Sequence, residues 1–225
     1  MIDQFRLRAL QEKDVASYLQ SNSAYTTWGK RFFDVSFVIL ASPSILLTVA
    51  ILWVLVRLDG GPGFYSQKRV GQGGREFDCW KLRSMVPNSH QVLHDILESD
   101  PVLRAEWERD QKLKEDPRIT ALGRILRKTS LDELPQFWNV LKGDMSIVGP
   151  RPVLPEELER YGSNARHYLS IRPGVTGAWQ VSGRNELRYE ERVAIDVGYA
   201  GSFTLFLDTK IVVLTVWELL RLGGR

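Results

Sequence analysis

Asp132 and Glu133 are adjacent carboxylates in the stretch "TSLDELPQFWNVLKGDMSIVGPRP", residues 129–152, and lie just ahead of Pro135. An aspartate is ionised at neutral pH, so it can attack phosphorus without a partnering base. A second carboxylate can hold Mg²⁺, which prefers oxygen ligands and neutralises charge on the phosphates under attack. The pair could therefore supply a nucleophile and a metal ligand for phosphoryl transfer.

The same residues also fit a purely structural interpretation. Ser130 and Glu133 match a capping box, and a helix that starts there would run to Lys142 and stop at Gly143. Pro135 fits this imperfectly, because it would fall at the fifth helical position, where its missing N–H is needed. Alternatively, the helix begins later and leaves both carboxylates at or before its start. The residues alone leave both interpretations open.

Basic residues in stiff, turn-rich segments favour the chemical interpretation. Arg151 stands between two prolines in "VGPRP", and "SIRPGVTGAWQVSGRN" supplies two further arginines. A guanidinium grips phosphate with a planar fork, and rigid placement avoids ordering entropy on binding. A diphosphate site is therefore predicted from six residues: Lys81, Arg83, Arg127, Arg151, Arg172 and Arg184.

Two of these cations lie in "FDCWKLRSM", which has the pattern of a short strand. Side chains alternate across a strand, so Cys79, Lys81 and Arg83 would share one face. That face is either a cationic platform for phosphate or an ordinary solvated basic surface.

Residues 35–56 form a 22-residue run without a charge. As a straight helix this run would be about 33 Å long, enough to cross a hydrocarbon core of about 30 Å. Ser42 and Pro43 lie inside it; proline removes a backbone donor and predicts a bend, and the serine hydroxyl can bond the freed backbone. The two arms would reach roughly 12 and 20 Å, a depth suited to one leaflet.

Basic residues flank this run on both sides: Lys30 and Arg31 precede it and Arg57 follows it. The positive-inside rule therefore favours neither orientation, and a re-entrant hairpin with both ends in the cytoplasm satisfies both flanks. A kinked helix that crosses the membrane and a buried helix of a soluble core are the alternatives.

The composition limits the possible partners and the domain organisation of the chain. The 225 residues carry a net charge of only +3, which does not favour nucleic acid, and the single cysteine excludes an internal disulfide. We expect a leader over 1–28, the re-entrant membrane helix over 29–57 and a cytoplasmic catalytic domain over 58–225. The predicted class is α+β, mostly helical, with small β elements, charged surface helices over 89–116 and interfacial amphipathic helices. The apolar segment near the C-terminus is expected to lie on the membrane surface or to pack against the core.

Taken together, these motifs identify a resemblance to a known family. "KRFFD", "FYSQKRVGQGGREF", "SLDELPQ" followed by "GDMSIVGPRP", and "RPGVTGAWQVSGRN" are similar to the bacterial sugar transferases, the monotopic polyprenyl-phosphate hexose-1-phosphate transferases or phosphoglycosyl transferases. The resemblance runs from Lys30 almost to the C-terminus. It is greatest to the short galactose or glucose phosphotransferases of exopolysaccharide synthesis.

The resemblance implies roles for matching residues. Asp132 would be the nucleophile and Glu133 the Mg²⁺-binding carboxylate, while Ser42 and Pro43 would break a re-entrant helix. The phosphate-binding arginines would be Arg127, Arg151, Arg172 and Arg184, with Lys81 as a further basic residue.

The reaction implied by the family is ping-pong. The aspartate would attack the sugar-bearing phosphate of a UDP-sugar, with UDP-galactose or UDP-glucose expected, and release UMP. Undecaprenyl phosphate would then accept the phosphosugar, at the cytoplasmic face of the bacterial inner membrane. Inner-membrane lipids are expected partners, and a homodimer and downstream glycosyltransferases are considered too. The alternatives are a non-enzymatic scaffold of polysaccharide assembly and a lipid-linked pyrophosphate hydrolase.

Overall fold

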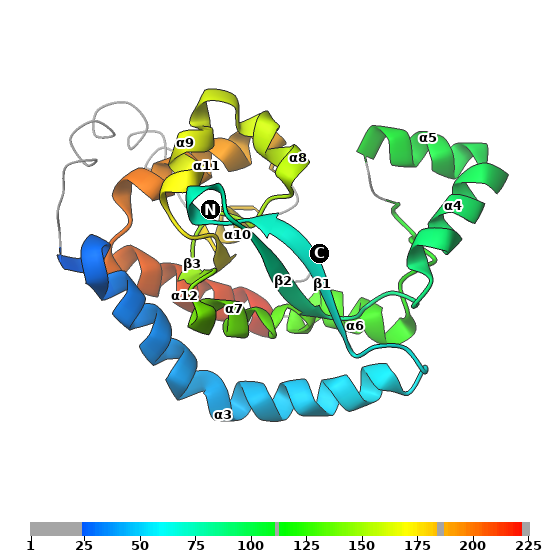
Figure 1. Cartoon of the computed structure of the whole chain (residues 1–225), viewed down its shortest axis with the longest axis horizontal. Coiled ribbons are helices and arrows are strands. Elements are labelled where there is room, and N and C mark those ends of the chain that lie inside the picture. Colours follow the sequence, from blue (N-terminus) through cyan, green and yellow to red (C-terminus); the bar gives the residue numbers. More distant parts are fainter. Residues whose placement is uncertain (1–23, 111–112, 184–186, 222–225) are drawn as a thin grey trace.

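The computed structural model describes residues 24–110, 113–183 and 187–221. The described chain is mostly helical, with two small two-stranded sheets (Figure 1). The expected class, mostly helical with small β elements, is confirmed. The helices are α3 (Lys30–Arg57), α4 (Ser89–Ser99), α5 (Pro101–Asp110), α6 (Ala121–Thr129), α7 (Gln136–Lys142), α8 (Pro155–Leu158), α9 (Ala165–Ser170), α10 (Ala178–Val181), α11 (Tyr189–Ser202) and α12 (Leu205–Leu220). The strands are β1 (Phe64–Val70), β2 (Glu76–Leu82), β3 (Ser146–Val148) and β4 (Gly174–Thr176).

Helix α3 is one continuous helix with a bend in its middle, which Figure 1 shows below the rest of the molecule. Pro43 has no N–H for the carbonyl of Ile39 one turn earlier. The hydroxyl of Ser42 donates to that carbonyl at 2.8 Å and replaces the missing bond. The predicted bend and serine bond are confirmed, and the segment is a single bent helix rather than two antiparallel arms.

Both ends of α3 pack against the body of the protein, while its middle is exposed. Val38 joins the main hydrophobic core, and Val56 packs with Leu82 and Leu126. Among the described residues, Tyr25–Arg57 is the one helical segment long and apolar enough to cross a membrane. Only 6% of its most apolar stretch is buried within the protein, so it is not the core helix of this domain.

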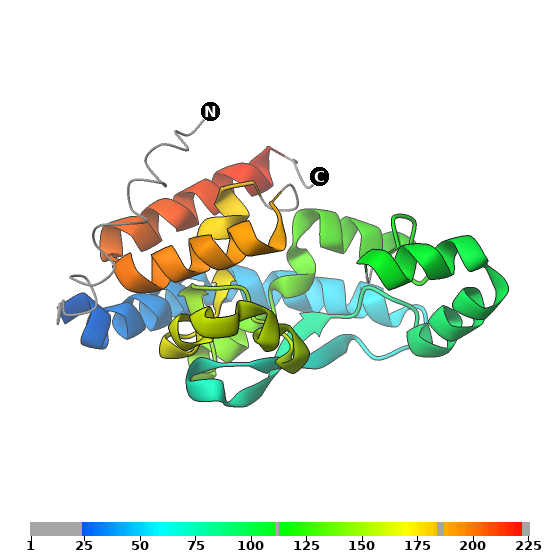
Figure 2. The ribbon, with the colours of Figure 1, turned by 90° about the horizontal axis from the view of Figure 1, so that it is seen from above.

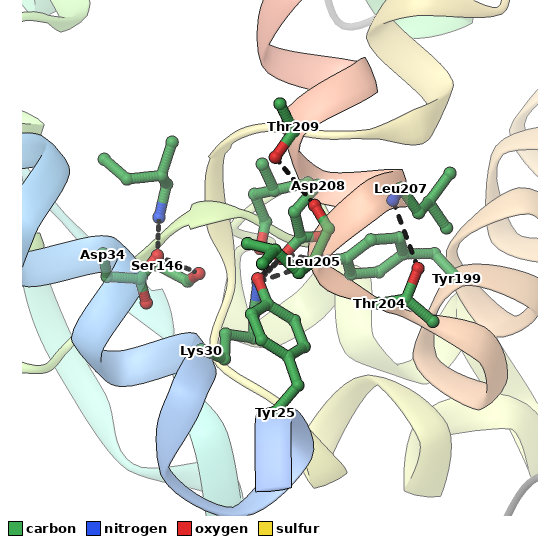
Figure 3. Close-up of polar contacts among 12 residues, drawn as sticks. Tyr25, Lys30, Asp34, Ser146, Tyr199, Thr204, Leu205, Leu207, Asp208 and Thr209 are labelled. Carbon is green, nitrogen blue, oxygen red and sulfur yellow. Dashed lines mark hydrogen bonds and ion pairs between the residues drawn. The ribbon is translucent and has the colours of Figure 1, made fainter. Parts of the chain in front are cut away.

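A buried polar network fixes the N-terminal arm of α3 (Figure 3). Lys30 Nζ lies 2.6 Å from Asp208 Oδ2 of α12, and the hydroxyl of Tyr199 on α11 donates to Asp208 Oδ1 at 2.6 Å. One helical turn further along, Asp34 Oδ1 accepts bonds from the hydroxyl of Ser146 and the amide of Ile147, both at 2.9 Å. The network therefore ties α3 to α11, α12 and β3.

Helices α4 and α5 stand away from the body in both views of the chain (Figures 1 and 2). Pro101 is the first residue of α5, where its missing N–H is tolerated. The prediction of charged surface helices interrupted at this proline is confirmed over 89–110, whereas residues 113–116, which it also included, lie outside any helix.

Helix α12 presents two different faces. Asp208 and Ile211 are buried against the core, whereas Phe206, Val213 and Trp217 are exposed. The sequence pattern had left open whether this helix packs against the core or lies on a membrane. Its buried face shows that it packs against the core, and its other face remains an exposed apolar surface.

Candidate active site

The two carboxylates lie in a short turn between two helices. α6 ends at Thr129, and Ser130 adopts a left-handed conformation with φ of 56°. Leu131–Glu133 then forms a 3₁₀ turn, and α7 starts at Gln136, immediately after Pro135. The capping-box expectation is therefore wrong, because the proline takes the position before the helix, where no N–H is needed. The alternative is confirmed: both carboxylates precede the helix, which ends at Lys142 and Gly143 as expected.

Asp132 is almost completely buried, with 7% of its surface exposed. Burial raises the pKa of its carboxyl to about 6, because a charged group is poorly solvated there. The nearby charges of Lys81 and Arg127 lower that pKa, and the charge of Glu133 raises it. Asp132 is thus mostly ionised at neutral pH but close to its titration point.

Lys81 is the cation that the structure brings directly to the carboxylate pair. Its Nζ lies 2.6 Å from Glu133 Oε1, with both side chains partly exposed. Asn139 of α7 fixes the spacing between the helix and the strand, because its side-chain amide donates to the carbonyl of Asp78 at 2.8 Å. Its Oδ1 in turn accepts the amide of Trp80 at 3.2 Å. α7 is therefore bonded to β2 on either side of Cys79, two residues before Lys81.

Arg83 lies outside this group, although the strand pattern had placed it on the same face as Lys81. β2 ends at Leu82, and the guanidinium of Arg83 turns toward the loop after α3. Its five N–H groups are all used: by Asp59 twice, and by the carbonyls of Pro62, Met85 and Val56. Arg83 thus connects β2 to the end of α3, and we do not include it in the phosphate site.

Within the described parts of the chain, the side chains of Arg127 and Arg172 each donate one hydrogen bond and have further donors available for other groups. Arg127 Nε donates to the hydroxyl of Ser84 at 2.8 Å. Its guanidinium lies near enough to Asp132 for its charge to lower the pKa of that carboxyl. Arg172 Nε donates to the carbonyl of Gly143 at 2.8 Å, so it caps the end of α7. The structure thus brings Arg127 to the carboxylates and places Arg172 at the far end of α7.

The "GPRP" and "RPG" motifs lie against each other through their glycines. The amide of Gly149 donates to the carbonyl of Thr176 at 2.9 Å, and the amide of Gly174 donates to that of Pro150 at 2.8 Å. A Cβ atom on Gly149 would lie 2.5 Å from the carbonyl oxygen of Arg172, so only glycine allows this approach. This crossing fixes the backbone that carries Arg151.

Arg184, the last of the predicted phosphate-binding residues, lies outside the described residues. Sequence reasoning missed Arg69, which donates to the carbonyl of Pro152 at 3.1 Å and lies 3.3 Å from Glu157. It also missed Arg192 and Trp179, which lie beside Arg151. No local pattern marks these residues, because each reaches the site from a different element.

The carboxylate pair suits Mg²⁺ chemically. The described residues contain no group of three or more histidine, cysteine or acidic side chains that could hold a metal by themselves. Mg²⁺, however, is commonly bound by one or two carboxylates together with substrate phosphates. Glu133 keeps one carboxylate oxygen outside its ion pair with Lys81, so the donor set fits such an ion.

Comparisons with known proteins identify relatives of this chain. Residues 25–222 match the family described as bacterial sugar transferase. An undecaprenyl-phosphate galactose phosphotransferase of Salmonella typhimurium is 53% identical over 199 residues, covering 87% of this chain and 41% of the relative. The exopolysaccharide production protein ExoY of Sinorhizobium fredii is 48% identical over 192 residues, covering 83% of each chain.

A more distant relative is the UDP-glucose:undecaprenyl-phosphate glucose-1-phosphate transferase of Escherichia coli. It is 38% identical over 193 residues, covering 80% of this chain and 38% of the relative. The chain therefore spans about two fifths of the length of the Salmonella and Escherichia relatives.

Proposed function

The chain belongs to the bacterial sugar transferase family, and from this premise we propose that it transfers a hexose-1-phosphate from a UDP-sugar to undecaprenyl phosphate, releasing UMP. The names of the relatives support UDP-galactose or UDP-glucose as donor and exopolysaccharide synthesis as the setting. The observation that carries the proposal is the buried Asp132 carboxylate beside the ion pair of Glu133 and Lys81.

In the first step, a carboxylate oxygen of Asp132 would attack the sugar-bearing phosphorus. The bond between that phosphorus and the oxygen shared with UMP would break, and UMP would leave with its electron pair. In the second step, a phosphate oxygen of undecaprenyl phosphate would attack the aspartyl phosphosugar. The aspartate would leave as a carboxylate, and the product would be undecaprenyl diphosphate hexose.

The surrounding residues would position the diphosphate and balance its charge. Burial makes the Asp132 carboxylate poorly solvated, so its oxygen needs little desolvation before attack. The charges of Lys81 and Arg127 lower the pKa of Asp132, and both cations would also attract the phosphates. We propose that Glu133 holds Mg²⁺, which when bound would neutralise charge on the diphosphate.

We further propose that α3 is re-entrant and that the protein is monotopic on the cytoplasmic face of the inner membrane. Both ends of α3 pack on the same body, and basic residues flank both ends. The exposed middle of α3 and the exposed face of α12 would contact lipid. The division into a membrane helix over 29–57 and a catalytic domain over 58–225 rests on this topology.

The topology can be tested with single cysteines at the two flanks of α3, in a background where Cys79 is replaced. Labelling of positions 28 and 57, which are both exposed and lie at the two ends of α3, from the cytoplasmic side only is expected. Labelling of the two positions from opposite sides would show that the helix crosses.

The activity can be tested with purified protein, a panel of UDP-sugars and undecaprenyl phosphate. Wild-type protein should release UMP only in the presence of Mg²⁺, and Asp132→Asn should lose this activity while remaining in the membrane fraction. Release of free sugar phosphate without a lipid acceptor would instead identify a hydrolase. No turnover with any donor would favour a non-enzymatic scaffold.

A further inference from the structure

Two arginines from distant parts of the chain contact the same indole ring. Arg151 follows β3 in the "GPRP" loop, and its Cζ lies 5.8 Å from the ring centre of Trp179 in α10. Arg192, on α11, places its Cζ 5.2 Å from the same ring. Trp179 is only 6% exposed, so both guanidinium groups pack against one buried ring.

Neither of these arginines has a carboxylate partner. Within residues 24–110, 113–183 and 187–221, no ion pair involves Arg151 or Arg192, and Arg192 Nε is buried without a hydrogen-bond partner. Burial lowers the pKa of Arg192, and the neighbouring charge of Arg151 lowers it further. Two neighbouring cations that make no ion pair favour the binding of an anion.

Other arginines of this protein are satisfied by the protein itself. Arg83 uses all five of its N–H groups on protein oxygens. Arg69, close to Arg151, is paired with Glu157 at 3.3 Å and also donates to a backbone carbonyl. Arg127 and Arg172 also keep donors free, but each donates one bond to the protein, whereas in the described parts of the chain the side chains of Arg151 and Arg192 donate none.

Asp196 and Glu157 are the nearby acids, and they compensate the positive charge of the pair only in part. Asp196 of α11 is 3% exposed and accepts a hydrogen bond from the hydroxyl of Tyr161 at 2.9 Å. Burial raises the pKa of Asp196 to about 7, although Tyr161, the backbone and charge of Arg151, and the charge of Arg192 lower it. At neutral pH this carboxyl is therefore only partly ionised, and the pair keeps a positive excess.

The arginine pair belongs to the same region as the carboxylates. The buried thiol of Cys79 on β2 is influenced by the charges of Lys81 and Glu133 and also by those of Arg69 and Arg151. Cys79 and Lys81 are two residues apart on one face of the strand. Arg151 therefore lies within electrostatic reach of the strand that carries Lys81.

We propose that Arg151 and Arg192, held on Trp179, form a binding site for a phosphate monoester. Two planar guanidinium groups suit such a dianion in charge and in hydrogen-bond geometry. The identity of the monoester rests on the proposed function, which supplies two: the phosphate of UMP as it leaves, and that of undecaprenyl phosphate as it enters. Arg192 and Trp179 are the new members of the site.

The site is tested by isothermal titration calorimetry on detergent-solubilised protein, with UMP and farnesyl phosphate as separate probes. Arg192→Met removes the charge but keeps most of the aliphatic stem. We expect it to weaken binding of at least one probe about tenfold or more, the loss of one charged hydrogen-bonding group. Arg160→Met is the matched control, because Arg160 also stacks on an aromatic ring, that of Tyr189 at 3.7 Å, but on the exposed surface.

The two probes distinguish the source of the phosphate. Selective loss of UMP binding assigns the site to the donor nucleotide, and selective loss of farnesyl phosphate binding assigns it to the acceptor. Loss of both supports one site shared by the two steps. Unchanged binding of both probes, or equal weakening by Arg160→Met, would overturn the proposal.

Two further measurements separate this inference from a structural role and from the proposed function. Without ligand, Arg192→Met should unfold at the same temperature as wild type or higher, because it relieves repulsion; a clear decrease would indicate a structural role. Arg192→Lys keeps the charge without the planar fork and should bind the probe at intermediate strength. Weaker phosphate binding in a protein without transferase activity would leave the site standing and refute only the function.

Discussion

Asp132→Asn should make the protein more stable while removing its activity. The wild-type carboxyl is buried, and its pKa is raised from 3.8 to about 6, so ionisation in the folded state is unfavourable. A shift of about two pH units corresponds to roughly 3 kcal/mol of folding free energy. Asparagine has nearly the same shape and no charge, so it avoids this cost.

The size of the stabilisation depends on pH. A carboxyl whose folded pKa is raised binds its proton more tightly when folded, so wild type loses stability as pH rises from about 4 to 6 and does not regain it above. The advantage of Asp132→Asn should therefore be complete at pH 8. It should fall to about half at pH 5 and nearly vanish at pH 4.

Thermal unfolding in detergent measures this difference. About 3 kcal/mol corresponds to an increase of roughly 5–10 °C in Tm for a domain of this size. Asp95→Asn, at an exposed position on α4, is the control and should leave Tm unchanged at each pH. A lower Tm for Asp132→Asn at pH 8 would refute the reasoning, because it would mean that nearby cations stabilise the carboxylate by more than burial destabilises it.

Three other changes test the elements that position the site. Lys30→Met leaves the carboxylate of Asp208 buried without its cation and should destabilise the protein by about 3–5 kcal/mol. The loss should appear as a lower Tm, and adding Asp208→Asn to the same chain should restore part of it. Asn139→Ala leaves the amide of Trp80 unpaired and should cost about 1–3 kcal/mol and lower kcat, whereas an unchanged kcat would show that this contact does not position β2. The kcat/KM of wild type should fall below pH 6 as Asp132 is protonated, and a flat profile from pH 5 to 8 would contradict its role.

Elements that are determined by residues close together in the sequence could be predicted, namely the long apolar helix, its bend and the surface helices. An uncharged run of 22 residues predicts a long apolar helix, and Pro43 predicts the position of its bend, with Ser42 supplying the compensating bond. The surface helices on either side of Pro101 could be predicted for the same reason, since a proline is tolerated at the start of a helix.

The conformation around the carboxylates could be narrowed to two alternatives but not decided. A capping box at Ser130 and a helix that begins after Pro135 use overlapping residues, and the missing N–H of the proline decided between them. Alternation along a strand grouped Lys81 with Arg83, but the strand ends between them and Arg83 satisfies its donors elsewhere. Alternation predicts which side chains share a face only for residues that lie within the strand.

Contacts between distant segments could not be predicted at all. Arg151 and Arg192 are 41 residues apart and contact the same ring only because α10 brings Trp179 to both. The same holds for Lys30 and Asp208, which join α3 to α12. One sequence contains no signal for such pairs, because their partners are chosen by tertiary packing.

Mass spectrometry of the protein incubated with donor alone tests most directly whether Asp132 carries the phosphosugar. UDP-galactose or UDP-glucose without a lipid acceptor should add one hexose phosphate to the chain, on the peptide that contains Asp132. Asp132→Asn should acquire no adduct, and adding undecaprenyl phosphate should discharge the wild-type adduct. Continued product formation without an adduct, or an adduct on another side chain, would contradict a covalent aspartyl intermediate.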